Sequence, residues 1–251
     1  MITVIRIAGP MLTWPSPSKY RFRQTEAGPT LSAIQGLLAS AMGVARDQAR
    51  PAWIENMSVA IRLDRPGSVI RDYHTINPVK RTAYRQLSRH DQLKLRMVVK
   101  GNGADHQSPV ITERYYRQDQ AVLLFFDDPS GNAFQAFTNP KFALYAGRKA
   151  CVLSFPFLLG RTLGSLEHAL ISVPSVTPAN QNYLEAVLFA PPTELTRYKE
   201  PVSRPERPAG RVGENYLMQE RYTVLVNPPR LNSWWEVLDT FKTGGTGHVA
   251  F

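Results

Sequence analysis

The sequence predicts an α+β fold with an antiparallel sheet, and three observations support this. Short runs of alternating apolar and polar residues are typical of half-buried strands. One stretch near the amino terminus carries the caps and the apolar spacing of a helix. The 251 residues include 20 prolines and 16 glycines, which interrupt the chain too often for a helical bundle or a coiled coil.

The amino-terminal part predicts a strand followed by a helix. Ile2–Ala8 alternates β-branched residues with polar ones, and Gly9–Pro10 predicts that the strand ends there. A helix is expected next, because Thr30 or Ser32 can cap its start and Gly43 can end it. Apolar residues between these caps recur at helical spacing.

The remaining elements are shorter. A weak helix is expected over 52–57 and a strand over 58–63. Further along, the pattern predicts a buried strand over 120–127, short helices over 132–138 and 163–171, and late strands over 183–189 and 221–226. This order is close to a split βαβ unit, which is the ferredoxin-like or RNA-recognition topology.

The division of the chain follows from these elements. A ferredoxin-like domain is expected over 1–160 and a small β-rich carboxy-terminal portion over 161–243. The Pro-rich stretch 196–213 is expected to be an extended linker or loop, and 244–251 a flexible tail.

A basic, aromatic segment over 71–117 interrupts the predicted sheet. It holds ten cations against four acids, a net of +6 out of +10 for the chain. Its ends, 69–75 and 110–116, look like two strands of an inserted hairpin, with a turn at 101–103 between them. Cations interleaved with tyrosines suit single-stranded nucleic acid, which offers phosphates to pair with and bases to stack on. The alternative is a solvated basic loop.

Several function classes are disfavoured by what the sequence lacks. No apolar run approaches the roughly 20 residues of a membrane span, and the amino terminus has no secretory pattern, so we expect a cytoplasmic protein. The single cysteine, Cys151, allows no internal disulfide and is expected to be a small buried hydrophobe. The nucleotide-binding loop Gly-x-x-x-x-Gly-Lys-Ser/Thr and the metal-binding motif His-Glu-x-x-His are both absent, so neither a metal nor a cofactor is expected.

Two local motifs are candidates for RNA contact. In a strand over 71–75, Arg71, Tyr73 and Thr75 would share one face, while Asp72 and His74 would lie on the other. The second motif, Gly147-Arg148-Lys149, combines two cations with a glycine, whose backbone can approach a phosphate closely.

These motifs also carry a family resemblance. The sequence presents, in order, Ala8-Gly9-Pro10-Met11 with Trp14, the helix with Gly36-Leu37-Leu38, Arg71-Asp72-Tyr73-His74-Thr75, and Tyr145-x-Gly147-Arg148-Lys149-x-Cys151. This order resembles the Cas-five family of the repeat-associated mysterious protein superfamily, and within it the type I-E branch of CRISPR Cascade subunits. Arg148–Val152 departs from the family's frequent Arg-Arg-Ser-Cys-Pro, and no family motif is found beyond residue 196.

The resemblance implies a fold and a role. It implies a ferredoxin-like domain with a protruding hairpin thumb, here 71–117, and no catalytic duty. Its expected partners are crRNA, whose 5′ handle it would hold, a backbone subunit of CasC type, a large subunit of CasA type and, through that heteromeric complex, target DNA. The expected RNA-contacting residues are Arg71, Tyr73, His74, Lys80, Arg81, Arg85, Lys94, Arg96, Arg114 and Tyr115 on the arm, and Ser32, Gln35, Gly147, Arg148 and Lys149 on the body.

Two alternative functions remain open at this point. The first is a metal-independent endoribonuclease that processes precursor crRNA, as in the type I-C branch, because Tyr73, His74 and Lys80 could supply acid–base groups. The second is a general RNA-recognition module. That alternative would need aromatic side chains exposed on the central strands, whereas Phe125 and Phe126 lie in a strongly apolar run.

Overall fold

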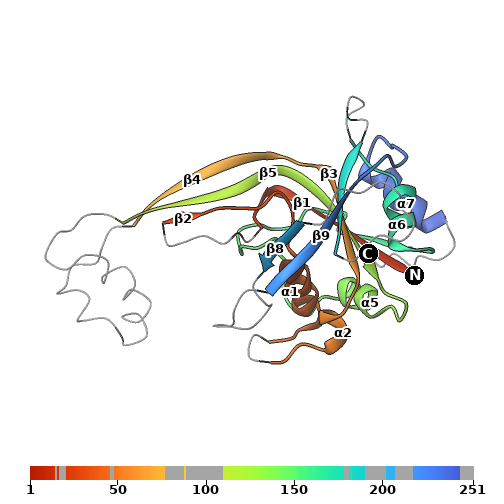
Figure 1. Ribbon diagram of the computed structural model, residues 1–251, viewed down its shortest axis with the longest axis horizontal. Helices are drawn as coiled ribbons and strands as arrows, with labels where there is room; N and C mark the ends of the chain where they lie inside the picture. The colour runs from red at the N-terminus through yellow and green to blue at the C-terminus, as the bar shows by residue number, and fades with distance from the viewer. Residues whose placement is uncertain are drawn as a thin grey trace, which may run out of the picture.

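The structure, a computed structural model, describes residues 1–14, 16, 21–45, 48–76, 88, 110–177, 181, 183–189, 202–206 and 217–243. Across these residues nine strands form one sheet (Figure 1). Apart from the short β2, every strand pairs antiparallel with its neighbours. The predicted α+β class with an antiparallel sheet is confirmed.

The strands follow the order β6-β1-β5-β3-β7-β9-β8 across the sheet, and β2 and β4 pair with β5 beside this path. Their bounds are β1 Ile2–Leu12, β2 Phe22–Arg23, β3 Val59–Arg65, β4 Ser68–Ile76, β5 Val110–Asp127, β6 Leu158–Thr162, β7 Leu184–Leu188, β8 Val202–Glu206 and β9 Leu217–Val226. The helices are α1 Leu31–Met42, α2 Ala52–Glu55, α5 Asn132–Thr138, α6 Leu166–Ser172 and α7 Trp234–Thr243.

The two faces of the sheet build two hydrophobic cores, because successive side chains of a strand point to opposite faces. On β5, Leu124 belongs to the core that also contains residues of α1, α2 and α5. Leu123 belongs to the core that contains residues of α6 and α7. The sheet is therefore covered by helices on both sides, and its central strands are buried.

Strand β5 is longer than the sequence pattern predicted. Two separate strands were expected, over 110–116 and 120–127, but β5 runs without a break over 18 residues. Its second half pairs with β1 and β3, and its first half pairs with β4. The polar residues between the two halves do not end the strand, because β1 continues to pair beside them as far as Leu12.

The predicted end of β1 at Gly9–Pro10 is also wrong. The strand continues to Leu12, and Gly9 has a packing reason instead. A Cβ atom at Gly9 would lie 2.6 Å from the backbone oxygen of Val152, which is closer than real Cβ atoms approach. The glycine therefore permits the segment after Cys151 to run alongside β1, where Ser154 donates a backbone hydrogen bond to Ala8.

Four elements were not predicted, and one of them is strand β6 over Leu158–Thr162. Strand β2 lies in what looked like a loop, β8 lies inside the stretch 196–213 that was interpreted as a linker or loop, and α7 begins at Trp234. Helix α7 carries a signal that could have been found, since Val237, Leu238 and Phe241 recur at helical spacing and are buried. The turn at 101–103 and the tail 244–251 lie outside the described residues.

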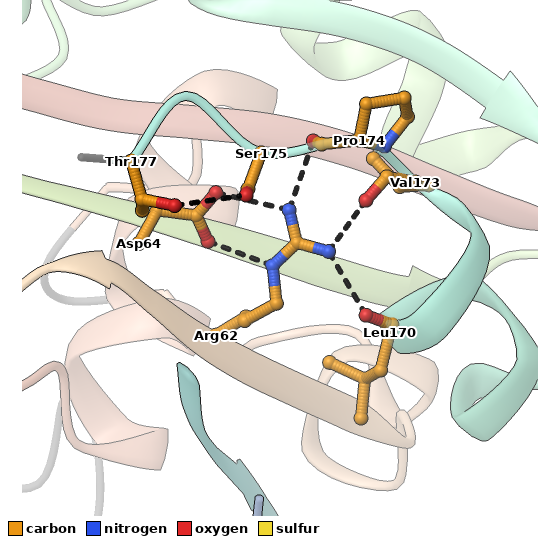
Figure 2. Close-up of polar contacts among 7 residues, drawn as sticks. All are labelled: Arg62, Asp64, Leu170, Val173, Pro174, Ser175 and Thr177. Atoms are coloured by element: carbon orange, nitrogen blue, oxygen red, sulfur yellow. Dashed lines mark hydrogen bonds and ion pairs between the residues drawn. The ribbon is translucent and has the colours of Figure 1, made fainter. Parts of the chain in front are cut away.

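A buried guanidinium on β3 forms hydrogen bonds with the end of α6 and the residues directly after it (Figure 2). The Nε and Nη2 atoms of Arg62 donate to the two carboxylate oxygens of Asp64, at 2.7 and 2.9 Å. Its remaining N–H groups donate to the carbonyls of Leu170, Val173 and Pro174, at 2.6–3.0 Å. Both charged side chains are fully buried, so the end of α6 is held by a charge that is completely hydrogen-bonded.

Candidate nucleic-acid interface

Strand β4 and residues 110–118 of β5 form an antiparallel ribbon, here called the β4–β5 arm, that extends away from the helices (Figure 1). Residues directly opposite each other in such a ribbon share a face. One face carries the pairs Arg71 with Tyr115 and Tyr73 with Glu113. The other face carries the pairs Asp72 with Arg114 and His74 with Thr112. The alternation predicted for residues 71–75 is confirmed.

On the face that carries Tyr73, the Glu113 carboxylate interacts with two neighbouring side chains. Arg71 forms an ion pair with this carboxylate at 3.4 Å, and the Tyr115 hydroxyl donates to it at 3.0 Å. Tyr73 itself is 54% exposed, so its ring is available for stacking. A single acid therefore holds a cation and a tyrosine beside an exposed ring, an arrangement that suits RNA.

The opposite face of the arm holds the histidine. His74 Nε2 lies 2.5 Å from the Asp72 carboxylate. Tyr73 and His74 thus point to opposite sides, and Lys80 lies outside the described residues, so the three groups of the ribonuclease alternative are not brought together by the described residues. In the part of the chain that the structure describes, no group of three potential metal-ligating side chains occurs.

Arg148 connects the body to the base of the arm. Its guanidinium lies 4.5 Å from the centre of the Tyr116 ring. It also donates long hydrogen bonds to the backbone oxygens of Tyr115, at 3.4 Å, and Arg23, at 3.3 Å. This side chain was predicted to contact RNA, and the structure shows that it contacts β5 and β2. Neighbouring Lys149 is exposed to solvent.

Gly147 is required by the protein backbone. Its φ of 81° lies in the left-handed region, which glycine adopts without steric cost. A Cβ atom there would lie 2.1 Å from the backbone oxygen of Thr13. The close approach that the sequence indicated at this glycine is therefore an approach to β1 and the residues that follow it.

The two candidates on α1 have protein partners. Ser32 Oγ lies 3.2 Å from the hydroxyl of Thr30, the residue that caps α1. The Gln35 side chain donates to the backbone oxygen of Glu55, at 3.2 Å. Neither contact brings these residues to the Gly147 turn. Lys80, Arg81, Arg85, Lys94 and Arg96 lie outside the described residues.

A pocket of about 220 Å³ lies between α1 and the Gly147 turn. Ala33, Leu37 and Ser40, one turn apart on α1, line one wall, and Trp14, Tyr145 and Gly147 line the other. The Trp14 indole donates to the buried side chain of Gln120, at 2.6 Å. That amide in turn donates to the backbone oxygens of Ala27 and Pro66, so the tryptophan ring is held in place.

A comparison with protein families decides the affiliation. The family described as "CRISPR-associated protein (Cas_Cas5)" matches residues 2–212. This chain belongs to the Cas5 family. The family resemblance found in the sequence motifs is thereby confirmed.

Relatives of this Cas5-family protein agree with the assignment. It is 30% identical to the CRISPR system Cascade subunit CasD of Escherichia coli (strain K12) over 173 aligned residues. The aligned region covers 62% of this chain and 69% of the relative. Its fold matches a chain of a "CRISPR RNA-guided surveillance complex" with a TM-score of 0.68 at 20% identity, covering 97% of this chain and 100% of the other. It also matches a "Crystal structure of Cas protein" with a TM-score of 0.64 at 23% identity, covering 93% and 100%.

Sequence reasoning missed part of this candidate interface. Trp14 and Tyr145 were noted only as parts of the family motif, and Ala33 and Ser40 not at all, because a pocket wall of small residues has no local signature. Exposed Phe22 was missed as well. It lies on β2, whose two residues pair parallel with Glu113 and Arg114 of β5, beside the middle of the arm, a long-range pairing that a local pattern does not reveal.

Proposed function

We propose that this protein is a non-catalytic subunit of a Cascade surveillance complex that binds crRNA and holds its 5′ handle. The observation that supports this most is the exposed face of the β4–β5 arm, where Arg71 and Tyr73 lie together at the start of a strongly basic segment. Its membership of the Cas5 family and its similarity to CasD support a place in such a complex.

The fold supports a detailed version of this proposal. The order β6-β1-β5-β3, with α1 after β1 and α5 after β5, is the arrangement expected of a ferredoxin-like unit over 1–160. Residues 161–243 would extend that unit through β7, β8 and β9. The thumb would be the segment 71–117, which includes the β4–β5 arm and the basic sequence between its two strands.

The roles proposed for the side chains differ between arm and body. Arg71 and Lys149 would pair with phosphates and Tyr73 would stack on a base. Further phosphate contacts would come from other cations of the segment 71–117, namely Lys80, Arg81, Arg85, Lys94 and Arg96. Arg148 would support RNA binding indirectly, by holding the arm in position, because its described contacts are with β5 and β2. The complex would also contain a backbone subunit of CasC type and a large subunit of CasA type, and would work in the cytoplasm.

The direct test is RNA binding by charge-reversal variants. We expect Lys80→Glu/Arg81→Glu to weaken binding of crRNA and to flatten its salt dependence, by about 0.7 in the logarithmic slope for each phosphate that the variant no longer neutralises. The control is Lys141→Glu/Lys242→Glu, which makes the same charge change at two exposed lysines of the body. Equal affinity and slope for the two double variants would contradict the proposal.

A second measurement separates binding from catalysis. The purified protein is incubated with a repeat-containing precursor RNA, with and without EDTA, beside His74→Ala. We expect no cleavage under either condition. Specific, EDTA-resistant cleavage that His74→Ala abolishes would instead make this protein a processing ribonuclease.

A further inference from the structure

We propose that another protein of the complex docks on the exposed rings of Phe155 and Trp235 and pairs a carboxylate with Arg6, which is buried beside them. This inference rests on the proposed function, because it assigns a surface of the subunit to a neighbouring protein. It concerns the α7 side of the body, away from the arm and from the Gly147 turn.

The two rings are exposed although both side chains are large and apolar. Phe155 precedes β6 and is 60% exposed, and Trp235 on α7 is 55% exposed. Their ring centroids lie 5.3 Å apart, so the rings form one continuous apolar surface, here called the aromatic pair. Aromatic residues are enriched at protein–protein interfaces, and tryptophan and arginine often contribute most of the binding energy there.

Arg6 supplies the polar part of the site. Its residue is only 6% exposed, lies 4.8 Å from the centre of the Trp234 ring and donates to the Pro156 carbonyl at 3.1 Å. These two contacts are with the chain neighbours of Trp235 and Phe155. Among the described residues its buried Nε has no acceptor. Burial of an incompletely hydrogen-bonded cation is unfavourable, so an acceptor supplied by a partner would stabilise it.

Arg62 shows within the same protein what Arg6 lacks. Both arginines are cross-strand neighbours of Leu123. Asp64, two residues after Arg62 on β3, accepts from its Nε and Nη2 (Figure 2). Two residues after Arg6 on β1 stands Ala8, which is buried and has no carboxylate. A carboxylate from outside the chain would complete the same side-on, bidentate pair at Arg6.

The charges around the aromatic pair favour a protein over RNA. Glu236 and Asp239 follow Trp235 on α7 and are exposed, and only one cation, Lys242, pairs with them, at 3.0 Å from Asp239. These acids would repel the successive phosphates of a nucleic acid, whereas a single carboxylate can pair with Arg6. Helix α7 also lies at the opposite end of the molecule from the outer part of the arm (Figure 1). The partner is therefore a protein segment that carries Asp or Glu beside an apolar side chain.

The first test is a competition for places in the complex. Parent and variant protein carry different tags and are mixed in equal amounts with crRNA and limiting amounts of the other subunits, and their ratio in the purified complex is measured. We expect Arg6→Met and Trp235→Ala each to be depleted about 30-fold or more, which is the effect of truncating a central arginine or tryptophan of an interface.

Phe142→Ala is the matched control for the loss of an exposed ring. Phe142 is 49% exposed, and its backbone bonds to Ser40 of α1, on the other face of the sheet. This variant should enter the complex as readily as the parent. Melting temperatures identify any variant that fails to fold, and Trp235→Ala, which changes an exposed side chain, decides if Arg6→Met does so.

The second test identifies the partner's carboxylate. Phe155 is replaced by the photoreactive amino acid p-benzoylphenylalanine, and the assembled complex is irradiated. We expect a crosslink to a peptide of another subunit in which Asp or Glu lies next to an apolar residue. Changing that acid to its amide should deplete the complex as much as Arg6→Met does, and both changes together should cost no more than either alone, because they remove one ion pair. Additive losses would overturn the pairing with Arg6.

RNA binding separates this inference from the proposed function. We expect Arg6→Met and Trp235→Ala to bind crRNA as the parent does. If both variants enter the complex as readily as the parent, the docking proposal is overturned while the arm proposal stands. A crosslink to RNA, or to a second copy of this chain, overturns it as well. If the parent neither binds crRNA nor enters the complex, the proposed function fails and the docking proposal fails with it.

Discussion

Two buried arginines on the same face of the sheet differ in how many of their N–H groups have a hydrogen-bond acceptor. Arg6 on β1 and Arg62 on β3 are the two cross-strand neighbours of Leu123 on β5. Every N–H group of Arg62 has an acceptor. Arg6 donates to the Pro156 carbonyl and lies 4.8 Å from the Trp234 ring, and its Nε has no acceptor among the described residues. Burial lowers the pKa of Arg6 to about 10.

Loss of the Arg62 guanidinium should be severely destabilising. Arg62→Met would leave the Asp64 carboxylate buried without its partner and three carbonyls without donors, at a cost of about 3–5 kcal/mol of unfolding free energy. Urea denaturation would measure it. Arg62→Met/Asp64→Leu should recover part of the loss, because no charge of the pair remains buried. A double variant less stable than Arg62→Met would contradict this explanation.

Loss of the Arg6 side chain should have a much smaller effect. Its charged form is already disfavoured by burial, so Arg6→Met removes a desolvated charge together with one hydrogen bond and one ring contact. These effects offset each other, and we expect a change within about 1 kcal/mol. The same denaturation experiment tests this, and a loss as large as that of Arg62→Met would show that the two arginines are equivalent.

At the scale of elements, the Gly147 turn should depend on its glycine. Gly147→Ala imposes the left-handed backbone on an alanine, at about 1–3 kcal/mol, and adds a collision with the Thr13 carbonyl. Gly36→Ala is the matched control, since a Cβ there meets no atom closer than 3.9 Å. Glycine loses more backbone entropy than alanine in a helix, so Gly36→Ala should raise the unfolding free energy by about 0.5–1 kcal/mol. Opposite shifts in melting temperature are expected.

The adjacent cations of this turn should separate into a structural and a binding role. Arg148→Gln removes the interaction with the Tyr116 ring and two long hydrogen bonds, so we expect a loss of about 1–2 kcal/mol in stability. Lys149→Gln should leave stability within about 0.5 kcal/mol and lower the salt slope of RNA binding by about 0.7. If Arg148→Gln preserves stability and changes only the slope, its guanidinium contacts RNA directly.

Local signals decided which elements could be predicted. Helix α1 was found because Thr30 and Gly43 mark its ends, and the burial of Phe125 and Phe126 followed from their apolar run. The division of β5 and the linker assigned to 196–213 were wrong for a shared reason. In both places the strand is held by pairing with another strand, with the distant β1 for β5 and with the next strand, β9, for β8, and the sequence around it is polar.

At the scale of the whole molecule, stability should depend on binding partners. A ligand that binds the folded protein alone raises its melting temperature as concentration increases. We expect crRNA and the backbone subunit to raise the melting temperature of this protein, and the Lys80→Glu/Arg81→Glu variant to show less of the RNA effect. Equal melting temperatures with and without RNA would oppose a role as an assembled subunit.

The length of β5 also determines how force would pass through the molecule. A strand of 18 residues spans about 60 Å at roughly 3.4 Å per residue, from the outer part of the arm to the centre of the sheet. Tension applied to the arm along this strand would be borne by the backbone of β5 and by its ladders with β1 and β3. If the arm binds RNA as proposed, a pull on that RNA would be resisted by the strand ladders in the most buried part of the protein.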